Sequence, residues 1–246
     1  MEMLKKALDI GCGVAMYAGA KTMFPTYKWV GIDRTDFTRF YSPGDFFVHN
    51  VKDYLPFAAN TFDLVWSHHV LEHLPPIHPY AQYSWYNGPE DYLVWLINEI
   101  WRVLKPGGEA HLVVPWNKHT NAWRSPGHYR FFDENFFAYF GWNGNVADHE
   151  SCGLWSKWQV LRNEVVDNMH VYGILKSLEW ASKEERNAML GPFSKDWKAI
   201  DVPVELGHPL ISAGETQNAT VCIPDSTLVQ SQEIPGTEFG KSMDEH

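Results

Sequence analysis

Three histidines and a glutamate follow an apolar run in the stretch FDLVWSHHVLEHLPP, residues 62–76. His69, Glu72 and His73 are separated by three and four residues, so in a helix their side chains would lie on one side. Imidazoles and a carboxylate grouped in this way can bind a transition metal or transfer protons. The same residue types also occur where histidine caps or packs the end of a strand. The stretch therefore leaves three roles open: a metal site, an acid/base cluster or packing.

A glycine-rich stretch, LDIGCGVAMYAG at residues 8–19, is the second candidate for chemistry. Glycines between a strand and a helix let the backbone approach a ligand closely. The dinucleotide-binding pattern needs glycine at the position of Met16, and Asp9 would repel a phosphate. A cationic ligand reverses that objection, because a carboxylate attracts an ammonium or sulfonium group, and S-adenosylmethionine carries both. Asp33, twenty residues after Gly13, could accept hydrogen bonds from ribose hydroxyls.

The elements that must position these residues follow a βαβ pattern, which indicates an α/β fold with a mainly parallel sheet. We expect strands at KKALDI, KWVGID, DFFVHN, FDLVWS and GEAHLVVP, and a helix from Pro89 to Leu104. The segments KWQVLRNEVVD and NMHVYGILK flank Asp167-Asn168, which favours an antiparallel hairpin at the sheet edge. Ser67 and His68 leave the fourth strand at its carboxyl end, where open α/β sheets bind ligands.

Length and composition restrict the remaining possibilities. The 246 residues suit one main domain, for which we expect bounds of 1–181, followed by a partly disordered C-terminal extension at 182–246. The net charge of -10 disfavours a broad nucleic-acid surface. No span reaches the ~18 apolar residues of a membrane helix. The odd count of three cysteines favours a reducing compartment, and we expect a cytoplasmic protein.

Four stretches together carry a resemblance to a known family. LDIGCG, VGID, LPFAANTFDLVWSHHVLEHL and EIWRVLKPGGEAHLVVP, within roughly residues 5–116, resemble the successive motifs of class I S-adenosylmethionine-dependent methyltransferases. The nearest likeness is to the type-11 methyltransferase domain, in its small-molecule and glycan branch. The resemblance implies a Rossmann-like three-layer sandwich with a seven-stranded, mostly parallel sheet and an antiparallel last strand. It also implies S-adenosylmethionine as cofactor and a small-molecule or glycan acceptor, methylated at oxygen.

The resemblance assigns the cofactor contacts to the ends of successive strands. The turn after the first strand would line the methionine end, Asp33 would hold the ribose, and Asn50 with Val51 would meet the adenine edge. The expected cofactor-binding residues are Asp9, Gly11, Cys12, Gly13, Asp33, Asn50, Val51 and Ser67. Asn50 stands where relatives often have aspartate, but its side chain can still accept from the adenine amino group.

His68 and His69 are the expected catalytic residues, because a histidine of near-neutral pKa can remove the proton of a hydroxyl acceptor. The segment 69–73 also resembles the Glu-x-x-Glu-His segment of small-RNA 2′-O-methyltransferases and ubiquinone-pathway O-methyltransferases, which hold a divalent ion. Those families supply another histidine after the fifth strand. The resemblance implies a metal set of His69, Glu72, His73 and His128, in which histidine shifts the preference from magnesium toward zinc.

Two other functions compete with methyl transfer to a small molecule. The chain could be a non-catalytic S-adenosylmethionine-binding partner or regulatory module. The letters His-x-x-Glu-His also match an inverted zinc hydrolase motif, which needs a catalytic helix and a third ligand. Base N-methylation is disfavoured, because Ser-His-His-Val replaces the Asn/Asp-Pro-Pro-aromatic tetrapeptide of those enzymes. Two aromatic-rich loops, 75–89 and 116–130, leave the ligand edge and are candidates to enclose the acceptor.

Overall fold

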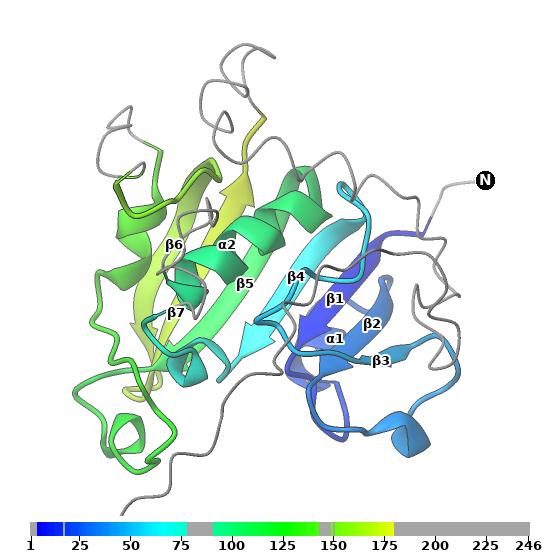
Figure 1. The fold of residues 1–246 in the computed structure, drawn as a ribbon, viewed down its shortest axis with the longest axis horizontal. Coiled ribbons are helices and arrows are strands. Elements are labelled where there is room, and N and C mark those ends of the chain that lie inside the picture. The colour runs from blue at the N-terminus through cyan, green and yellow to red at the C-terminus, as the bar shows by residue number, and fades with distance from the viewer. Residues whose placement is uncertain (1–3, 17, 78–90, 143–148, 150, 180–246) are drawn as a thin grey trace, which may run out of the picture. The chain divides into compact units, whose positions relative to one another are not determined.

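The computed structural model describes residues 4–16, 18–77, 91–142, 149 and 151–179 (Figure 1), which all lie within one unit, Met1–Leu210. In chain order the elements are β1 (Lys6–Ile10), α1 (Ala18–Met23), β2 (Lys28–Asp33), η1 (Thr38–Phe40), β3 (Phe46–Val48), β4 (Phe62–His68), η2 (Leu71–His73), α2 (Tyr92–Val103), β5 (Leu104–Pro115), η3 (Thr120–Ala122), η4 (Phe136–Phe140), β6 (Trp158–Val166) and β7 (His170–Ser177). The predicted extension at 182–246 lies outside the described residues.

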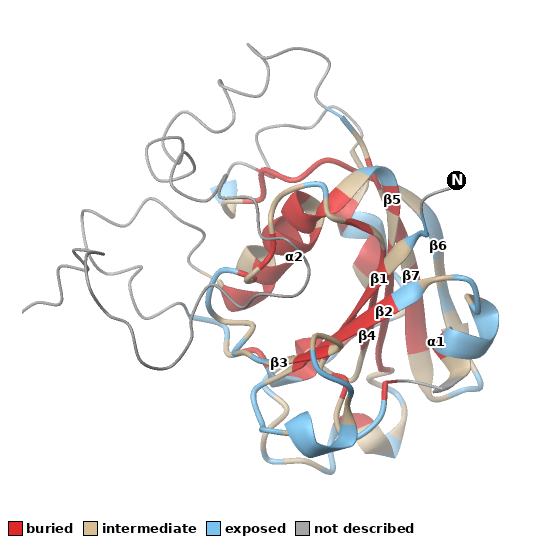
Figure 2. Ribbon diagram, turned by 90° about the vertical axis from the view of Figure 1, so that its right-hand side faces the viewer, coloured by how far each residue is buried: buried red, intermediate tan, exposed pale blue. Residues whose placement is uncertain are grey.

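The seven strands form one sheet in the order β3-β2-β1-β4-β5-β7-β6 (Figure 1). Neighbouring pairs from β3 to β5 are parallel, whereas β7 is antiparallel to both β5 and β6. Figure 2 shows α1 and α2 on opposite faces of the sheet, and the buried apolar residues form two clusters accordingly. The predicted Rossmann-like fold with an antiparallel strand among its last strands is confirmed.

Helix α2 begins later than the sequence pattern indicated. Its N-cap is Asp91, whose Oδ1 accepts hydrogen bonds from the backbone N–H of Leu93 at 2.7 Å and of Val94 at 3.3 Å. Such a cap satisfies two of the four N–H groups that a helix start leaves without partners. The predicted start at Pro89 lies outside the described residues, and the helix ends at Val103, because Leu104 is already extended and pairs with Phe62 in β4.

A buried ion pair attaches α2 to the segment between β3 and β4. Arg102 donates to both carboxylate oxygens of Glu99, at 2.8 and 2.7 Å, and also to the carbonyl groups of Leu55 and Phe57. Glu99 in turn accepts from the backbone N–H of Leu55 at 2.8 Å. Both charged groups are almost fully buried, and their donors and acceptors are matched, which is what a buried pair requires.

The segment after β4 is not the helix that the spacing of its histidines suggested. His69 has a φ of 59°, in the left-handed region, and only Leu71–His73 form a single 3-10 turn. The backbone N–H of His69 donates to the carbonyl of Val113 at 3.0 Å, so the pairing of β4 with β5 continues past His68. His69 and His73 therefore do not share a helical face. The inverted zinc hydrolase reading is wrong in its central requirement, because the catalytic helix is not formed.

The predicted hairpin is confirmed. Asp167 and Asn168 both have positive φ, 50° and 56°, as the two central residues of a type I′ turn require. The hairpin has a consequence for the site: because β7 runs antiparallel to β5, its first residue, His170, pairs with the last residue of β5, Pro115. His170 thus starts at the edge where the parallel strands end.

Candidate active site

The turn after β1 requires glycine at residue 11. Gly11 has a φ of 72°, and its backbone N–H donates to the carbonyl of Ile32 at 2.8 Å, which joins the turn to β2. A Cβ atom placed on Gly11 would lie 2.3 Å from Cγ2 of Val70, which follows β4. Both the backbone conformation and the close approach exclude a side chain here. The turn is therefore packed directly against the segment that carries the histidines.

Asp33 closes the other side of this turn. One carboxylate oxygen accepts from the backbone N–H of Gly13 at 3.1 Å, and the other accepts from the N–H of Thr35 at 2.9 Å. An ionised carboxylate has about four acceptor positions, so about two remain for a ligand. The arrangement fixes the orientation of Asp33 before any ligand binds.

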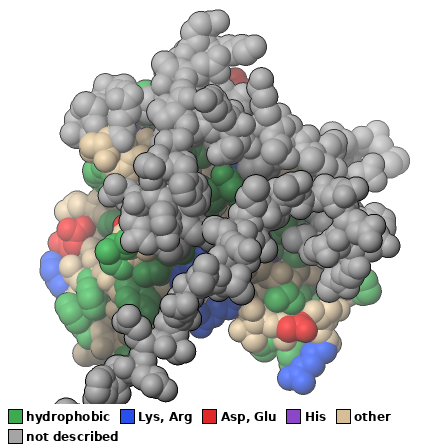
Figure 3. Space-filling model, viewed as in Figure 1, with side chains coloured by type: hydrophobic (Ala, Val, Ile, Leu, Met, Phe, Trp, Pro, Cys, Tyr) green, Lys and Arg blue, Asp and Glu red, His purple; other side chains and the backbone are tan. Residues whose placement is uncertain are grey.

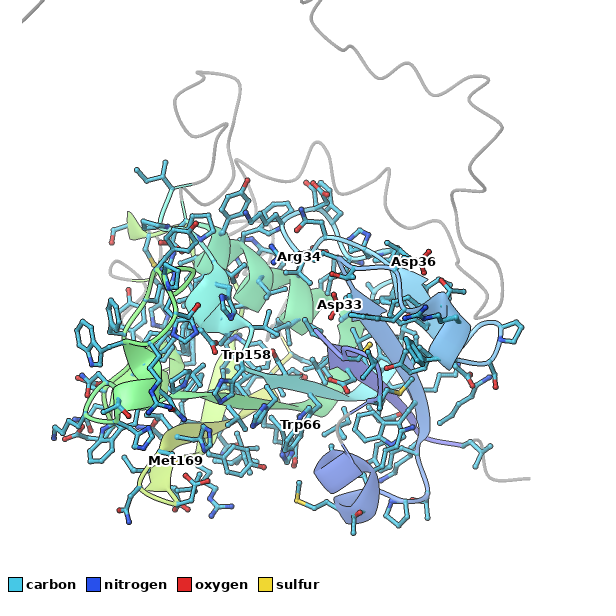
Figure 4. All side chains as sticks on the ribbon, turned by 90° about the horizontal axis from the view of Figure 1, so that it is seen from below. Asp33, Arg34, Asp36, Trp66, Trp158 and Met169 are labelled. Atoms are coloured by element: carbon cyan, nitrogen blue, oxygen red, sulfur yellow. The ribbon has the colours of Figure 1, made fainter. Side chains whose placement is uncertain are left out.

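A pocket of about 180 Å³ opens beside the turn. Its lining residues are Gly11, Asp33, Arg34, His49, Asn50, Val51, Lys52, His69, Val70, His73 and Leu74. Figure 4 looks onto this edge of the sheet and labels Asp33 and Arg34 there. The pocket thus brings together four of the eight predicted cofactor-binding residues with two of the predicted catalytic or metal-binding histidines. Its volume is below the roughly 300 Å³ of small ligand sites, so it suits part of a nucleoside.

The other four predicted cofactor residues do not line this pocket. Asp9 and Ser67 are only 2% and 1% exposed, at the ends of β1 and β4. Cys12 is also buried, and that burial raises the pKa of its thiol to about 12. Gly13 uses its N–H to bind Asp33 and its carbonyl to accept from the hydroxyl of Tyr41 at 2.9 Å. Within the described residues, these four therefore do not form the pocket wall.

Glu72 is a fully buried carboxylate beside the pocket. Its Oε1 lies 3.2 Å from Nδ1 of His69, yet neither carboxylate oxygen has a well-formed hydrogen bond within the described residues. A carboxylate without hydrogen bonds in an apolar interior is unfavourable unless a cation lies next to it. An ionised Glu72 would therefore need a protonated histidine or a metal ion beside it.

Five histidines surround Glu72, in two groups. Potential ligand atoms of Glu72, His73 and His128 lie within 4.8 Å of one another, and the same holds for His68, His69 and His170. The predicted metal set is thus divided: three of its members come together, while His69 lies with the second group. Sequence reasoning missed His170. The signal that could have found it is its place at the start of an antiparallel strand, which must begin where the parallel strands end.

The loop that carries His128 is held against the 3-10 turn. Tyr129 donates its backbone N–H to the carbonyl of Glu72 at 2.8 Å. His73 contacts the carbonyl of Gly127 through Nδ1 at 2.9 Å, and His128 contacts that of Ala122 in the same way. A carbonyl can only accept, so both rings carry their proton on Nδ1 when neutral. Their Nε2 atoms are then left with lone pairs.

His68 is the histidine whose ionisation is most strongly perturbed. Burial, together with the nearby rings of His69 and His170, lowers its pKa to about 4. The rings of His68 and His69 have centroids only 4.5 Å apart. His68 is accordingly neutral around pH 7.

The aromatic residues expected around an acceptor are described only in part. Tyr80, Tyr83, Trp85 and Tyr86 lie outside the described residues. Trp116 donates its indole N–H to Glu134 at 3.2 Å. Trp123 is 62% exposed and stacks on Phe131 with ring centroids 3.9 Å apart. Trp123, together with the exposed Tyr129, offers an open aromatic surface in the loop 116–130.

Two features are relevant to partners: the distribution of charged side chains on the surface and the length and polarity of the helices. In Figure 3 the blue and red side chains that are not behind grey atoms occur as separate small groups. No helix within the described residues is long and apolar enough to span a bilayer.

Comparison with known proteins adds sequence and structural similarity. The family model described as a methyltransferase domain matches residues 8–112. Comparison with curated proteins gave no match. Similar solved structures include the YcgJ protein from Bacillus subtilis, 15% identical with a TM-score of 0.45, covering 72% of this chain and 93% of that one.

Two further structures are similar to a comparable extent. The N-methyltransferase NodS from Bradyrhizobium japonicum, solved with S-adenosyl-L-homocysteine, is 15% identical with a TM-score of 0.43, over 71% of this chain and 79% of that one. An S-adenosylmethionine-dependent methyltransferase from Methanosarcina mazei is 19% identical with a TM-score of 0.46, over 73% and 95%.

The family match covers the segment that contains the glycine turn, Asp33 and the histidines of the pocket. The order of the strands and the antiparallel β7 agree with the fold that the resemblance implied. Residues 8–112 are therefore similar in sequence to a methyltransferase domain, over the segment that contains the pocket.

Proposed function

We propose that the protein transfers the methyl group of S-adenosylmethionine to an oxygen atom of a small-molecule or glycan acceptor. The observation that carries the proposal is the single pocket that joins the glycine turn and Asp33 to His69 and His73. The cofactor side and the side with proton-accepting groups are thus adjacent. We also retain, from the sequence alone, a cytoplasmic location and no nucleic-acid partner.

On the cofactor side, Asp33 would receive the ribose hydroxyls with the acceptor positions that Gly13 and Thr35 leave open. Asn50 and Val51 line the same pocket and would meet the adenine. The methionine end would lie along the turn at Gly11, where the backbone can approach closely. This order of contacts directs the sulfonium toward the end of β4.

On the acceptor side, methyl transfer from a sulfonium is an in-line displacement, so most of the catalysis is positioning. A hydroxyl acceptor must also lose its proton, and His68 and His69 are placed to take part in that step. His69 is the one that lines the pocket. We therefore propose that the acceptor oxygen binds between the sulfonium and these two rings.

We also propose, as predicted from the sequence, that a divalent ion binds at His69, Glu72, His73 and His128. It is supported by the buried charge of Glu72 and by the orientation of the rings of His73 and His128. Such an ion would neutralise Glu72 and polarise an acceptor oxygen.

Calorimetric titration with S-adenosylhomocysteine tests the cofactor site. Asp33→Ala removes two charge-assisted acceptors, and we expect an affinity loss of about 100-fold, or about 2.7 kcal/mol. Asp36→Ala is the matched control, because Asp36 is an exposed carboxylate on the same loop outside the pocket (Figure 4). Equal affinities of the two variants would show that the ribose site is elsewhere.

Turnover separates an enzyme from the alternative, a non-catalytic binding module. Formation of S-adenosylhomocysteine from S-adenosylmethionine is measured with a panel of hydroxyl, amine and saccharide acceptors. Methylation of a hydroxyl in the panel supports the proposal, and methylation only at nitrogen would correct the acceptor atom. Tight cofactor binding without turnover on any acceptor would favour the module.

A further inference from the structure

Three imidazoles from separate parts of the chain meet beside the pocket. His68 is the last residue of β4, His69 follows it in a left-handed conformation, and His170 is the first residue of β7. Their ring centroids are 4.5, 4.9 and 5.6 Å apart, and one nitrogen from each ring lies within 4.8 Å of the others. We propose that these three histidines bind a divalent transition metal, with zinc as the favoured ion.

Two of the three rings lie beside carboxylates. Nδ1 of His69 lies 3.2 Å from Oε1 of Glu72, and Nδ1 of His170 lies 2.9 and 3.0 Å from the two oxygens of Asp167. Metal-binding histidines characteristically donate one ring N–H to a carboxylate, which leaves the other nitrogen with its lone pair directed at the ion. The hydrogen bond from His170 to Asp167 therefore favours the tautomer that a metal requires.

The opposite nitrogen of His69 supports the same assignment. Its Nε2 is buried and has no hydrogen-bond partner within the described part of the chain. A buried imidazole nitrogen without a partner is unfavourable, and a metal ion would supply the missing partner. Since Nδ1 is directed at Glu72, Nε2 is the atom that would bind.

The distances fit a site that contracts slightly when the ion binds. Tetrahedral zinc with Zn–N bonds of about 2.0–2.1 Å holds its nitrogens about 3.3 Å apart. Since the nitrogens lie within 4.8 Å of one another, the rings need to approach by at most about 1.5 Å, which side-chain rotation can supply. Two of them leave from strand ends and the third from a turn, so no strand must move.

The donor set determines the class of metal. Three imidazole nitrogens suit zinc, copper, nickel or cobalt, whereas magnesium prefers oxygen ligands. Three protein ligands also leave a fourth position for a water or an acceptor oxygen. If the proposed function holds, the ion would lower the pKa of an acceptor hydroxyl in place of a histidine base. Metal binding itself does not depend on that function.

This assignment differs from the set Glu72, His73 and His128 in the use made of Glu72. In the three-histidine site Glu72 lies beside His69 and does not touch the ion. In the other set it would be a ligand. Substitution of His170 or His128 separates the two arrangements, because each residue belongs to only one group.

The test uses the full-length chain without a histidine tag, freed of metal with a chelator and titrated with Zn²⁺ against a chromophoric competitor. We expect one tightly bound zinc per wild-type chain. His170→Gln should lose at least about 100-fold in affinity, and Asp167→Asn, which only alters the orienting carboxylate, about 10–100-fold. His119→Gln is the matched control, because His119 belongs to neither group.

The outcomes are distinct. No tight zinc in the wild type would overturn the proposal, and so would zinc that is lost in His128→Gln but kept in His170→Gln. Circular dichroism of the metal-free variants shows whether a loss of zinc reflects unfolding. Asp167→Asn keeps all three histidines, so a weaker zinc affinity in this variant is a second test of the site. S-adenosylhomocysteine titration of the metal-free wild type tests the cofactor site separately, so either idea can fail alone.

Discussion

The two sides of the pocket hold their carboxylates in opposite ways. Asp33 accepts from two backbone N–H groups, which fix its orientation before a ligand binds. Glu72 is fully buried, its side chain receives no hydrogen bond within the described residues, and Nδ1 of His69 lies 3.2 Å from its Oε1. The main chain therefore orients the carboxylate on the side of Asp33, whereas on the histidine side no backbone group within the described residues orients the carboxylate of Glu72.

A third carboxylate, Glu99, shows what a satisfied buried acid looks like in this molecule. It is as buried as Glu72 but is paired with Arg102 and with a backbone N–H. The same chain thus contains one buried acid that is fully paired and one that is not. Glu99 lies in the scaffold, whereas Glu72 lies beside the pocket. Buried acids without matched partners are more often found at functional sites than in the scaffold.

Removing the partner of the paired acid should give the largest effect on folding. Arg102→Met leaves Glu99 buried and uncompensated, and we expect a loss of about 3–5 kcal/mol in the free energy of unfolding. Urea unfolding followed by circular dichroism measures the loss. Arg162→Met is the control, because Arg162 is an exposed residue paired with exposed Glu164. Similar losses in both variants would mean that burial of the pair is not what matters.

Disrupting the contact between Gly11 and Val70 should give the next largest loss of stability. Gly11→Ala places a methyl group 2.3 Å from Val70 and keeps a positive φ. We expect about 2–3 kcal/mol of destabilisation from strain and overpacking. The double variant Gly11→Ala with Val70→Ala removes the clash and should recover part of the loss. No recovery would assign the whole cost to the backbone conformation.

The sequence predicted the side of the pocket that contains Asp33 and the glycine turn better than the side that contains the histidines and Glu72. The positions of Asp33 and Gly11 could be predicted because each depends on a local event, a strand end or a turn between strand and helix. His170 could not be, because its place beside His68 requires the register of β7 against β5, which is set by contacts distant in sequence. The left-handed φ of His69 was equally hidden, because a β4–β5 hydrogen bond overrides its helix-like spacing.

A histidine away from the pocket provides a reference for pH. Burial lowers the pKa of His111, although Glu109 opposes the shift. The unfolded chain then binds more protons than the folded one below about pH 6.5, so this contribution is present above that pH and is lost on acidification. The stability of the wild type relative to His111→Phe should fall by up to about 1.4 kcal/mol per pH unit below about 6.5. A constant difference from pH 7.5 to 5 would show that His111 does not titrate on unfolding.

The smallest effect on the free energy of unfolding should come from substitution of Glu72. This result decides whether Glu72 and Glu99 are held differently. In the metal-free protein, Glu72→Gln breaks no hydrogen bond of Glu72 and removes a carboxylate that is unfavourable to bury. We therefore expect the free energy of unfolding to change by less than about 1 kcal/mol. Glu99→Gln is the matched control, and because it breaks a satisfied pair it should cost about 3 kcal/mol or more. Both are measured by urea unfolding after removal of metal. Equal costs would mean that Glu72 is as well compensated as Glu99. The two sides of the pocket would then not differ in the way their carboxylates are held, and the charge argument for a cation would no longer stand.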